Sequence, residues 1–310
     1  MIIIQELIDG MLHGDFYKAR EEASQIADPA LLGQIQAILE QSKNDAEKMY
    51  CYWILKDLGR NSGSIQVADY LMERVALEKK TRLRGQALKS LLFLHGVSDA
   101  TNAIAALRDK NRDVRRYAIH ALGACSDPQA EEALIGIVNS DDDPAATREA
   151  ALILARIATP RCVDSMVALF RRLPRDRMYD ITVTAALLAL ARVGAAQSLP
   201  LAVEELGASR SAFVNLACML VIEQHGNQAQ IETVINRLTA YLKKKNRQEM
   251  QYIVPLVETK YPDELTAGLS FLLKFADARV DDFLAFLRAN SARLFEREQS
   301  FLEDSLKRRA

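Results

Sequence analysis

Residues 112–134, RDVRRYAIHALGACSDPQAEEAL, contain one short amphipathic helix, a tight turn and the start of a second helix. Asp113 is expected to cap the first helix, because an aspartate side chain accepts a hydrogen bond from an early backbone N–H. Val114, Ala118 and Leu122 follow at spacings of four residues, which places them on one helical face. The stretch predicts a helix that buries a face centred on the small side chain of Ala118.

Gly123 is expected to end this helix, and Ser126, Asp127 and Pro128 are expected to start the next one. Proline is favoured at the first helical position, and the aspartate before it supplies a helix cap. An alanine at the centre of a buried face lets two helix backbones approach closely. The unit is therefore suited to stacking against similar units.

The same pattern recurs along the chain, which is the signature of a repeat array. Equivalent alanines recur at intervals of 31, 33, 35 and 31 residues, and we call them the anchor alanines: Ala87, Ala118, Ala151, Ala186 and Ala217. Cys51 and Ala19 extend the series toward the N-terminus at intervals of 36 and 32 residues. After Ala217, the next position equivalent to an anchor alanine falls near Ile253, and Pro255 is expected to disturb the helix that contains it.

Each period contains two predicted helices, with the sequences VRRYAIHALG at 114–123 and DPQAEEALIGIVN at 127–139 in one repeat. This pattern resembles the HEAT-repeat family in its bacterial, phycobilisome-lyase-type form. TRLRGQALKSLL at 81–92 and ATREAALILARI at 146–157 carry the same pattern. The resemblance implies an all-α fold: a right-handed α–α superhelix, or HEAT-like solenoid, of about nine helix pairs.

The resemblance also implies a role for Arg84, Arg115 and Arg148, which occupy equivalent positions. In HEAT proteins such an arginine commonly pairs with an aspartate of the neighbouring repeat. The sixth and seventh repeats carry Val183 and Val214 there, so the ladder of pairs is expected to stop after the fifth repeat.

The periodicity predicts a single domain over residues 1–310, with 291–310 forming a C-terminal capping helix with a polar outer face. The predicted helix pairs are 2–13 with 15–27, 29–42 with 44–58, 63–78 with 81–95, 98–109 with 112–124, 127–139 with 144–158, 160–173 with 177–193, 197–207 with 209–225, 228–244 with 247–260, and 262–275 with 279–290.

Composition narrows the class of protein. Half of the residues are apolar (49%), enough for a continuous core, and 40 basic residues balance 41 acidic ones, so no global field attracts nucleic acid or a membrane. The four cysteines lie far apart and lack metal-ligand spacing, which predicts reduced core thiols. The opening MIIIQELIDGM has no positively charged start, and a cytoplasmic protein is expected.

Turns inside successive repeats fall along one edge of a solenoid, and four of five are basic. These turns are 78–84, 108–112, 139–143, 171–177 and 243–247, of which 139–143 (NSDDD) is acidic. Cations are also favoured at helix C-termini, which gives a purely structural explanation. The functional interpretation is an edge that docks an acidic protein surface or, as the less favoured alternative, a phosphate backbone.

A second positional signal lies two residues after each anchor alanine, where the side chains change from polar to apolar: Lys89, His120, Ile153, Leu188 and Met219. The helices 181–193 and 216–222 are apolar nearly all round, so they must be covered on both sides. Burial by the array is favoured over an exposed patch for a partner.

Signals for catalysis are weak. No phosphate-binding glycine loop, nucleophile elbow, paired-carboxylate motif or histidine pair at ligand spacing occurs, so no catalytic residue, metal or cofactor is expected. Trp53 and Asp57 share a helix face, as does an aromatic–carboxylate pair in HEAT-like alkylpurine DNA glycosylases. A tryptophan between repeats is the favoured interpretation.

The sequence therefore predicts a non-catalytic scaffold or adaptor that holds a protein partner on its concave face and basic edge. A nucleic-acid partner is disfavoured, and no membrane partner is expected. The partner-binding residues are expected to be Arg82, Arg112, Arg116, His120, Arg175 and Arg177. Two alternatives remain open: a toxin-neutralising immunity protein or inhibitor, and a HEAT-like enzyme of the DNA glycosylase or bilin lyase type.

Overall fold

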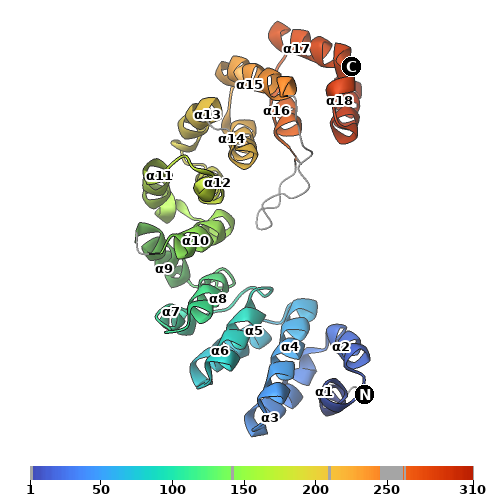
Figure 1. The fold of residues 1–310 in the computed structure, drawn as a ribbon, viewed down its shortest axis with the longest axis vertical. Coiled ribbons are helices and arrows are strands. Elements are labelled where there is room, and N and C mark those ends of the chain that lie inside the picture. The colour runs from blue at the N-terminus through green and yellow to red at the C-terminus, as the bar shows by residue number, and fades with distance from the viewer. Residues whose placement is uncertain (1–2, 141–142, 209–210, 245–260, 262, 310) are drawn as a thin grey trace. The chain divides into compact units, whose positions relative to one another are not determined.

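The computed structural model describes residues 3–140, 143–208, 211–244, 261 and 263–309. Over these residues the chain is all-α, as predicted, apart from one isolated β-bridge between Val97 and Cys125. The chain divides into two compact units, residues 1–153 and 154–310, with the division inside one helix. Each unit is a series of helix pairs (Figure 1).

Within its described residues, the first unit holds nine complete α-helices and most of a tenth. Their bounds are α1 Ile4–His13, α2 Phe16–Ser24, α3 Leu32–Gln41, α4 Asp45–Ser62, α5 Ile65–Leu77, α6 Thr81–Leu91, α7 Thr101–Ala106, α8 Arg112–Leu122, α9 Pro128–Asn139 and α10 Pro144–Ile157. Second helices stack in order, because α4 packs against α6 and α6 packs against α8. This stacking of equivalent helices is what makes the unit a solenoid.

The second unit repeats the arrangement. Its helices are α11 Val163–Arg172, α12 Asp180–Arg192, α13 Ser198–Ala208, α14 Ala212–His225, α15 Ile231–Lys243, α16 Glu264–Leu272, α17 Ala278–Ala289 and α18 Glu296–Arg309. Helix α14 packs against both α12 and α16. No described helix has both the length and the apolar character that a bilayer span requires.

The predicted stripe of small residues forms the core between helices. All five anchor alanines, and Cys51 before them, are at most 1% exposed. The apolar helices α12 and α14 are covered as expected, because Leu188 on α12 is half-buried and Met219 on α14 is buried. Ile153 on α10 is buried as well. Cys51, Cys162 and Cys218 are buried, whereas Cys125 is only half-buried.

The last two helix pairs differ from the prediction. Helix α16 packs against α14 and α15, so it is the second helix of the eighth pair rather than the first helix of the ninth. Helix α17 packs against α15 and α18 against α16, and they form the ninth pair. The predicted helix 247–260, with Ile253 and Pro255, lies outside the described residues.

Candidate functional site

The edge formed by the N-terminal ends of α8 and α10 carries Arg112 and Arg116, two of the four expected binding residues of the first unit. Helix α8 begins after Asn111, whose side-chain oxygen accepts hydrogen bonds from the backbone N–H groups of Asp113 (2.9 Å) and Val114 (3.1 Å). Asn111 is thus the helix cap, and the prediction that Asp113 caps α8 was wrong by two residues. Asp113 instead lies in the first turn, where a negative charge is favoured.

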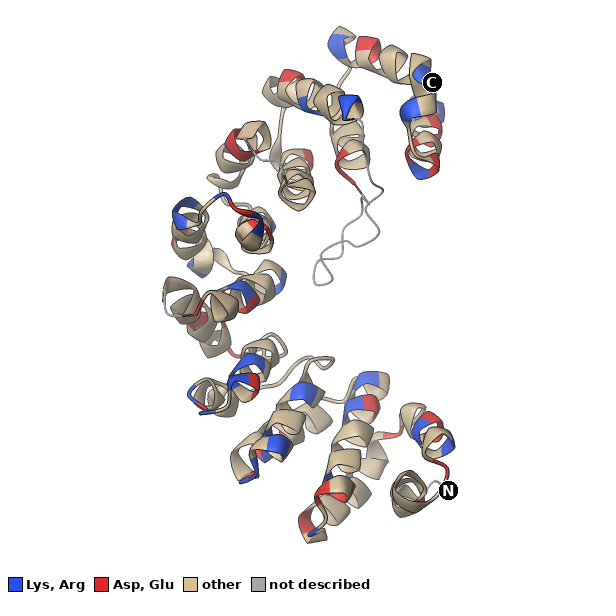
Figure 2. Ribbon diagram, in the orientation of Figure 1, with Lys and Arg blue, Asp and Glu red and all other residues tan. Residues whose placement is uncertain are grey.

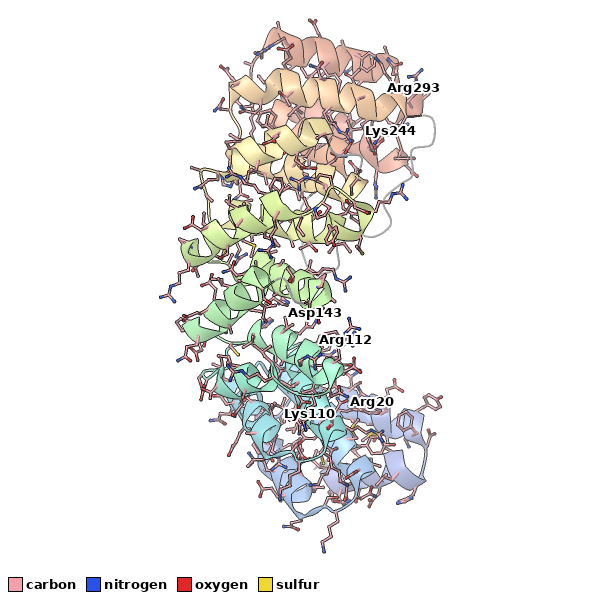
Figure 3. The ribbon with its side chains drawn as sticks, turned by 60° about the vertical axis from the view of Figure 1, so that its left-hand side comes forward. Arg20, Lys110, Arg112, Asp143, Lys244 and Arg293 are labelled. Atoms are coloured by element: carbon pink, nitrogen blue, oxygen red, sulfur yellow. The ribbon has the colours of Figure 1, made fainter. Side chains whose placement is uncertain are left out.

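Helix α10 is capped by Asp143, which accepts hydrogen bonds from Ala145 N (3.0 Å) and Ala146 N (3.2 Å). The carboxylate therefore occupies the end of the helix that would otherwise attract an anion. The other two acids of the predicted acidic turn, Asp141 and Asp142, lie outside the described residues. Arg112 and Asp143 lie next to each other on this edge (Figure 3).

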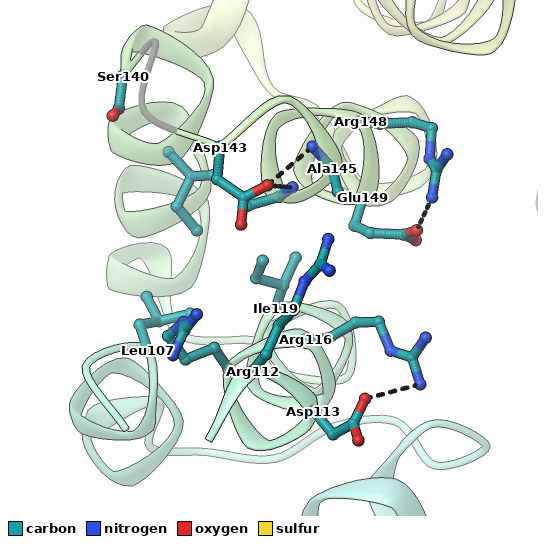
Figure 4. Close-up of a pocket in the computed structure, with 13 residues that line it drawn as sticks. Leu107, Arg112, Asp113, Arg116, Ile119, Ser140, Asp143, Ala145, Arg148 and Glu149 are labelled. Atoms are coloured by element: carbon teal, nitrogen blue, oxygen red, sulfur yellow. Dashed lines mark hydrogen bonds and ion pairs between the residues drawn. The ribbon is translucent and has the colours of Figure 1, made fainter. Parts of the chain in front are cut away.

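Between the two helix ends lies a groove of about 410 Å³ with an apolar floor and a charged rim (Figure 4). Leu107, Ile119 and Ile137 contribute apolar lining, and four arginines line the groove as well: Arg112, Arg115, Arg116 and Arg148. The side chain of Arg112 points from α8 across the groove toward α10. We refer to this cavity as the α8–α10 groove.

The arginines of the groove differ in how they are held. Arg115 donates hydrogen bonds to the backbone oxygens of Asp109 (2.8 Å) and Lys110 (3.1 Å), so it closes the turn before α8. Arg116 is 51% exposed, and its nearest carboxylate is Asp113 at 3.5 Å. Arg112 is exposed, and within the described part of the chain no hydrogen bond or ion pair holds its guanidinium. Arg112 is therefore the cation most available to a ligand.

His120 has a structural partner, contrary to the expectation of an outward, partner-facing side chain. Its Nε2 lies 3.1 Å from Oε2 of Glu149 on α10, and both side chains are largely buried. The hydrogen bond from His120, aided by Arg148 at 2.9 Å, lowers the pKa of Glu149 to about 2. His120 joins α8 to the following repeat and is not a free recognition residue.

The arginine ladder is confirmed at Arg84. Its Nε donates to Asp109 of the next repeat at 2.8 Å, and its Nη1 donates to the backbone oxygen of Glu78 at 2.9 Å. Arg148 departs from the expectation, because its ion partner is Glu149 of the same helix. The ladder thus joins neighbouring repeats at some positions and stays within one helix at others.

Arg175 was expected to bind a partner, but it continues the ladder in the second unit. Its Nε donates to Glu205 of the next repeat at 2.6 Å, and its Nη1 donates to the backbone oxygens of Phe170 (2.9 Å) and Leu173 (2.8 Å). Glu205 is only 5% exposed. The expectation that the ladder ends after the fifth repeat was therefore wrong, because the turn before α12 supplies the arginine that α12 lacks.

The six expected binding residues do not form one surface within a single unit. Arg82, Arg112, Arg116 and His120 belong to the first unit, and Arg175 and Arg177 belong to the second. Arg82 and Arg177 are exposed. Arg177 lines a second groove of about 460 Å³, which has Arg175 and Glu205 on its wall and lies at the equivalent position between α12 and α14.

Trp53 and Asp57 do not form an open catalytic pair. Trp53 is half-buried between the rings of Phe16 and Tyr50. The Asp57 side chain is 1% exposed and is held by Arg20 at 2.7 Å and by two further cations. In the parts of the chain that the structure describes, no group of histidine, cysteine or acidic side chains is placed to hold a metal ion.

Residues 100–179 match the family model for HEAT repeats. The match begins at α7 and ends at the turn before α12, so it contains both helices of the α8–α10 groove. It supports the HEAT-repeat family for this chain, whereas the bacterial, phycobilisome-lyase-type form remains a prediction. A comparison with curated proteins found no match.

Proposed function

We propose that the chain is a non-catalytic protein-binding module, a scaffold or adaptor, whose α8–α10 groove receives an acidic part of a protein partner. HEAT and similar repeat arrays commonly present extended surfaces to other proteins. A bacterial cytoplasmic location and a partner other than nucleic acid belong to the same proposal. The near-neutral net charge of -1 supports a local rather than a global attraction.

The observation that carries this proposal is that Arg112 is exposed and that no acidic side chain among the described residues pairs with it. Its guanidinium extends over an apolar groove floor and has no ionic partner among the described residues. A guanidinium in this position can form a bidentate pair with a carboxylate, which is among the stronger charged hydrogen bonds in proteins. Leu107 and Ile137, both half-buried, offer apolar area beside that contact.

The other exposed arginines support the groove rather than define it. Arg82 and Arg116 lie in the same unit and raise the positive potential that steers an acidic partner. Arg177 lines the groove of the second unit. His120 and Arg175 are omitted from the binding set, because Glu149 and Glu205 hold them.

The test is affinity capture from native lysate with the wild-type chain and with an Arg112→Glu, Arg116→Glu variant, followed by quantitative mass spectrometry. We expect the specific partner to be lost from the variant, since two rim cations become anions. The charge-matched control is Arg161→Glu with Arg288→Glu, both at exposed positions outside the two grooves.

Folding of both variants is checked by far-UV circular dichroism and thermal unfolding, because exposed substitutions should change stability by no more than about 0.5 kcal/mol each. A protein captured equally by the wild type and by the groove variant would contradict the assignment of this site. A partner lost equally from the groove variant and the control variant would show only a general charge effect and would also count against it.

A further inference from the structure

Four aromatic side chains gather on α2 and α4, away from the α8–α10 groove. Ring centroids lie 5.3 Å apart for Tyr50 and Trp53, 6.3 Å for Phe16 and Trp53, and 5.5 Å for Phe16 and Tyr17. Tyr17 is 83% exposed, which is unusual for so large an aromatic side chain. A core cluster would bury this ring, so the group extends from the core to the surface.

Three cations converge beside these rings on a single buried carboxylate. Asp57 lies 2.7 Å from Arg20, 3.1 Å from Lys56 and 3.4 Å from Arg60. Blue and red segments lie together at the carboxyl end of α4 (Figure 2). One carboxylate balances only one of the three positive charges, so the cluster keeps an excess of two.

The cations and the rings form one continuous surface. The Arg20 guanidinium lies 5.9 Å from the centroid of the Trp53 ring, and the Lys56 ammonium lies 5.8 Å from that of Phe93. Phe93, just after α6, is itself 54% exposed. The surface therefore runs from α2 over α4 to the end of α6, and we call it the Trp53 surface.

Folding alone gives a poor account of this arrangement. A single cation would neutralise Asp57, and each additional charge near it loses part of its hydration without a partner of its own. Exposed rings next to them add no burial. Trp, Tyr and Arg are the residue types that dominate the binding energy of protein interfaces.

We propose that the Trp53 surface is a second binding site, for an acidic segment of a protein that places carboxylates on Lys56 and Arg60 and an apolar side chain against Tyr17 and Phe93. The excess positive charge supplies complementarity to carboxylates, and the rings supply apolar area. This site is separate from the proposed function of the α8–α10 groove, and either can hold without the other.

The arrangement of the rings favours a protein over a single-stranded nucleic acid. Bases stack on open ring faces, whereas here the rings meet edge to face, with interplanar angles of 76° for Phe16 and Trp53 and 83° for Phe16 and Tyr17. Arg20 also lies over the Trp53 ring. The rings therefore do not form a row of parallel open faces for successive bases, whereas carboxylates need only the cations at the edge, where Arg60 is 49% and Lys56 is 21% exposed.

Trp53 gives a direct measurement, because it is the only tryptophan of the chain. The probe is the capped peptide Glu-Glu-Leu-Glu-Glu, which has no fluorophore of its own, titrated into the full chain at low salt. We expect a saturable change in Trp53 emission that weakens as salt screens the charges. A Lys56→Gln, Arg60→Gln variant should bind about tenfold more weakly, since it lacks the two excess charges.

The matched control is Lys18→Gln with Lys43→Gln, which removes two exposed positive charges of the same unit outside the cluster and should leave the titration unchanged. The Arg112→Glu, Arg116→Glu variant should also bind the peptide normally, which separates this site from the α8–α10 groove. Unfolding curves establish that each variant is folded, and the salt dependence of the wild type provides a test that needs no variant.

Three results would overturn the proposal: no emission change with the peptide, equal affinity in the Lys56 and Arg60 variant, or a titration that salt does not weaken. Tighter binding of a ten-residue oligothymidylate than of the peptide would instead assign the surface to single-stranded nucleic acid and reject an acidic protein segment.

Discussion

Arg84 and Arg175 reach the same kind of partner from different places in the repeat. Each donates to backbone oxygens at the end of its own repeat's first helix, and each pairs with an acid of the next repeat. The sequence predicts the first case, because Arg84 recurs at a fixed helical position. It does not predict the second, because Arg175 lies in a turn, where helical spacing no longer fixes which side chain reaches the acid.

Loss of a ladder arginine is expected to destabilise the fold. Arg84→Ala leaves Asp109, whose side chain is only 10% exposed, without its charged donor, and we expect about 2 kcal/mol less free energy of unfolding. Urea unfolding measures the change. Arg82→Ala, two residues away and exposed, is the control and should cost at most about 0.5 kcal/mol. Equal effects of the two substitutions would contradict a structural role for Arg84.

Glu149 makes stability depend on pH. Its pKa falls from 4.5 to about 2 on folding, since His120 and then Arg148 stabilise the carboxylate. A group with a lowered folded pKa contributes stability that is complete above the unfolded value and is lost as pH falls from 4.5 toward 2. We expect the wild type to lose stability more steeply over this window than Glu149→Gln. Parallel curves from urea titrations would contradict the prediction.

Within the elements, glycine at the end of a second helix permits close packing on the next repeat. A Cβ at Gly123, after α8, would lie 2.8 Å from Cγ2 of Ile153 on α10. At Gly226, after α14, a Cβ would lie 2.8 Å from Cε2 of Phe271 on α16 and 2.5 Å from the backbone oxygen of Ile222, so both the next repeat and its own helix exclude a side chain. The sequence predicts that Gly123 ends a helix, but the contact that excludes a larger residue depends on the neighbouring repeat.

Gly123→Ala tests this packing against a matched control. The added methyl group must displace Ile153, and we expect a loss of about 1–3 kcal/mol in the free energy of unfolding. Gly136 lies within α9 with no atom near its missing Cβ, so Gly136→Ala should instead stabilise the chain by about 0.5–1 kcal/mol. Thermal or urea unfolding gives both signs, and stabilisation by Gly123→Ala would refute the steric argument.

Helix positions are predicted well where caps and turns are strong. Asp127 and Pro128 begin α9 as expected, with Asp127 accepting a hydrogen bond from Gln129 N at 2.9 Å. The prediction fails at the last pairs, because the anchor series weakens near Ile253 and gives no register beyond it. The contacts of α16 with α14 and α15 define that register. Helical spacing in the sequence does not predict which helices contact one another.

At the scale of the whole molecule, repeat arrays are stabilised mainly by contacts between neighbouring repeats. The two compact units therefore need not unfold together. Trp53 reports only on the first unit, whereas far-UV circular dichroism reports on helices of both. We expect their urea transitions not to coincide. Superimposable curves would show a single cooperative transition and reject this prediction.

The candidate site is predicted only in part, for a physical reason. Charge along the chain identifies Arg112 and Arg116 as exposed cations at a repeat edge, and the structure places both at the α8–α10 groove. Charge alone does not distinguish a free cation from one that an acid holds, and so the sequence does not predict that Glu205 holds Arg175 or that Glu149 holds His120. The convergence of Arg20, Lys56 and Arg60 on Asp57 requires coordinates as well.

The direction of the ladder limits how this chain can gain or lose modules. Arg84 depends on an acid that belongs to the module after it, so excising residues 98–123 would leave Arg84 facing whatever follows. Arg175 depends in the same way on Glu205 of the next module. A module transplanted to a new position is therefore compatible with it only if the module that follows offers a carboxylate to its arginine. Modules of this kind cannot be exchanged freely, and their order is constrained.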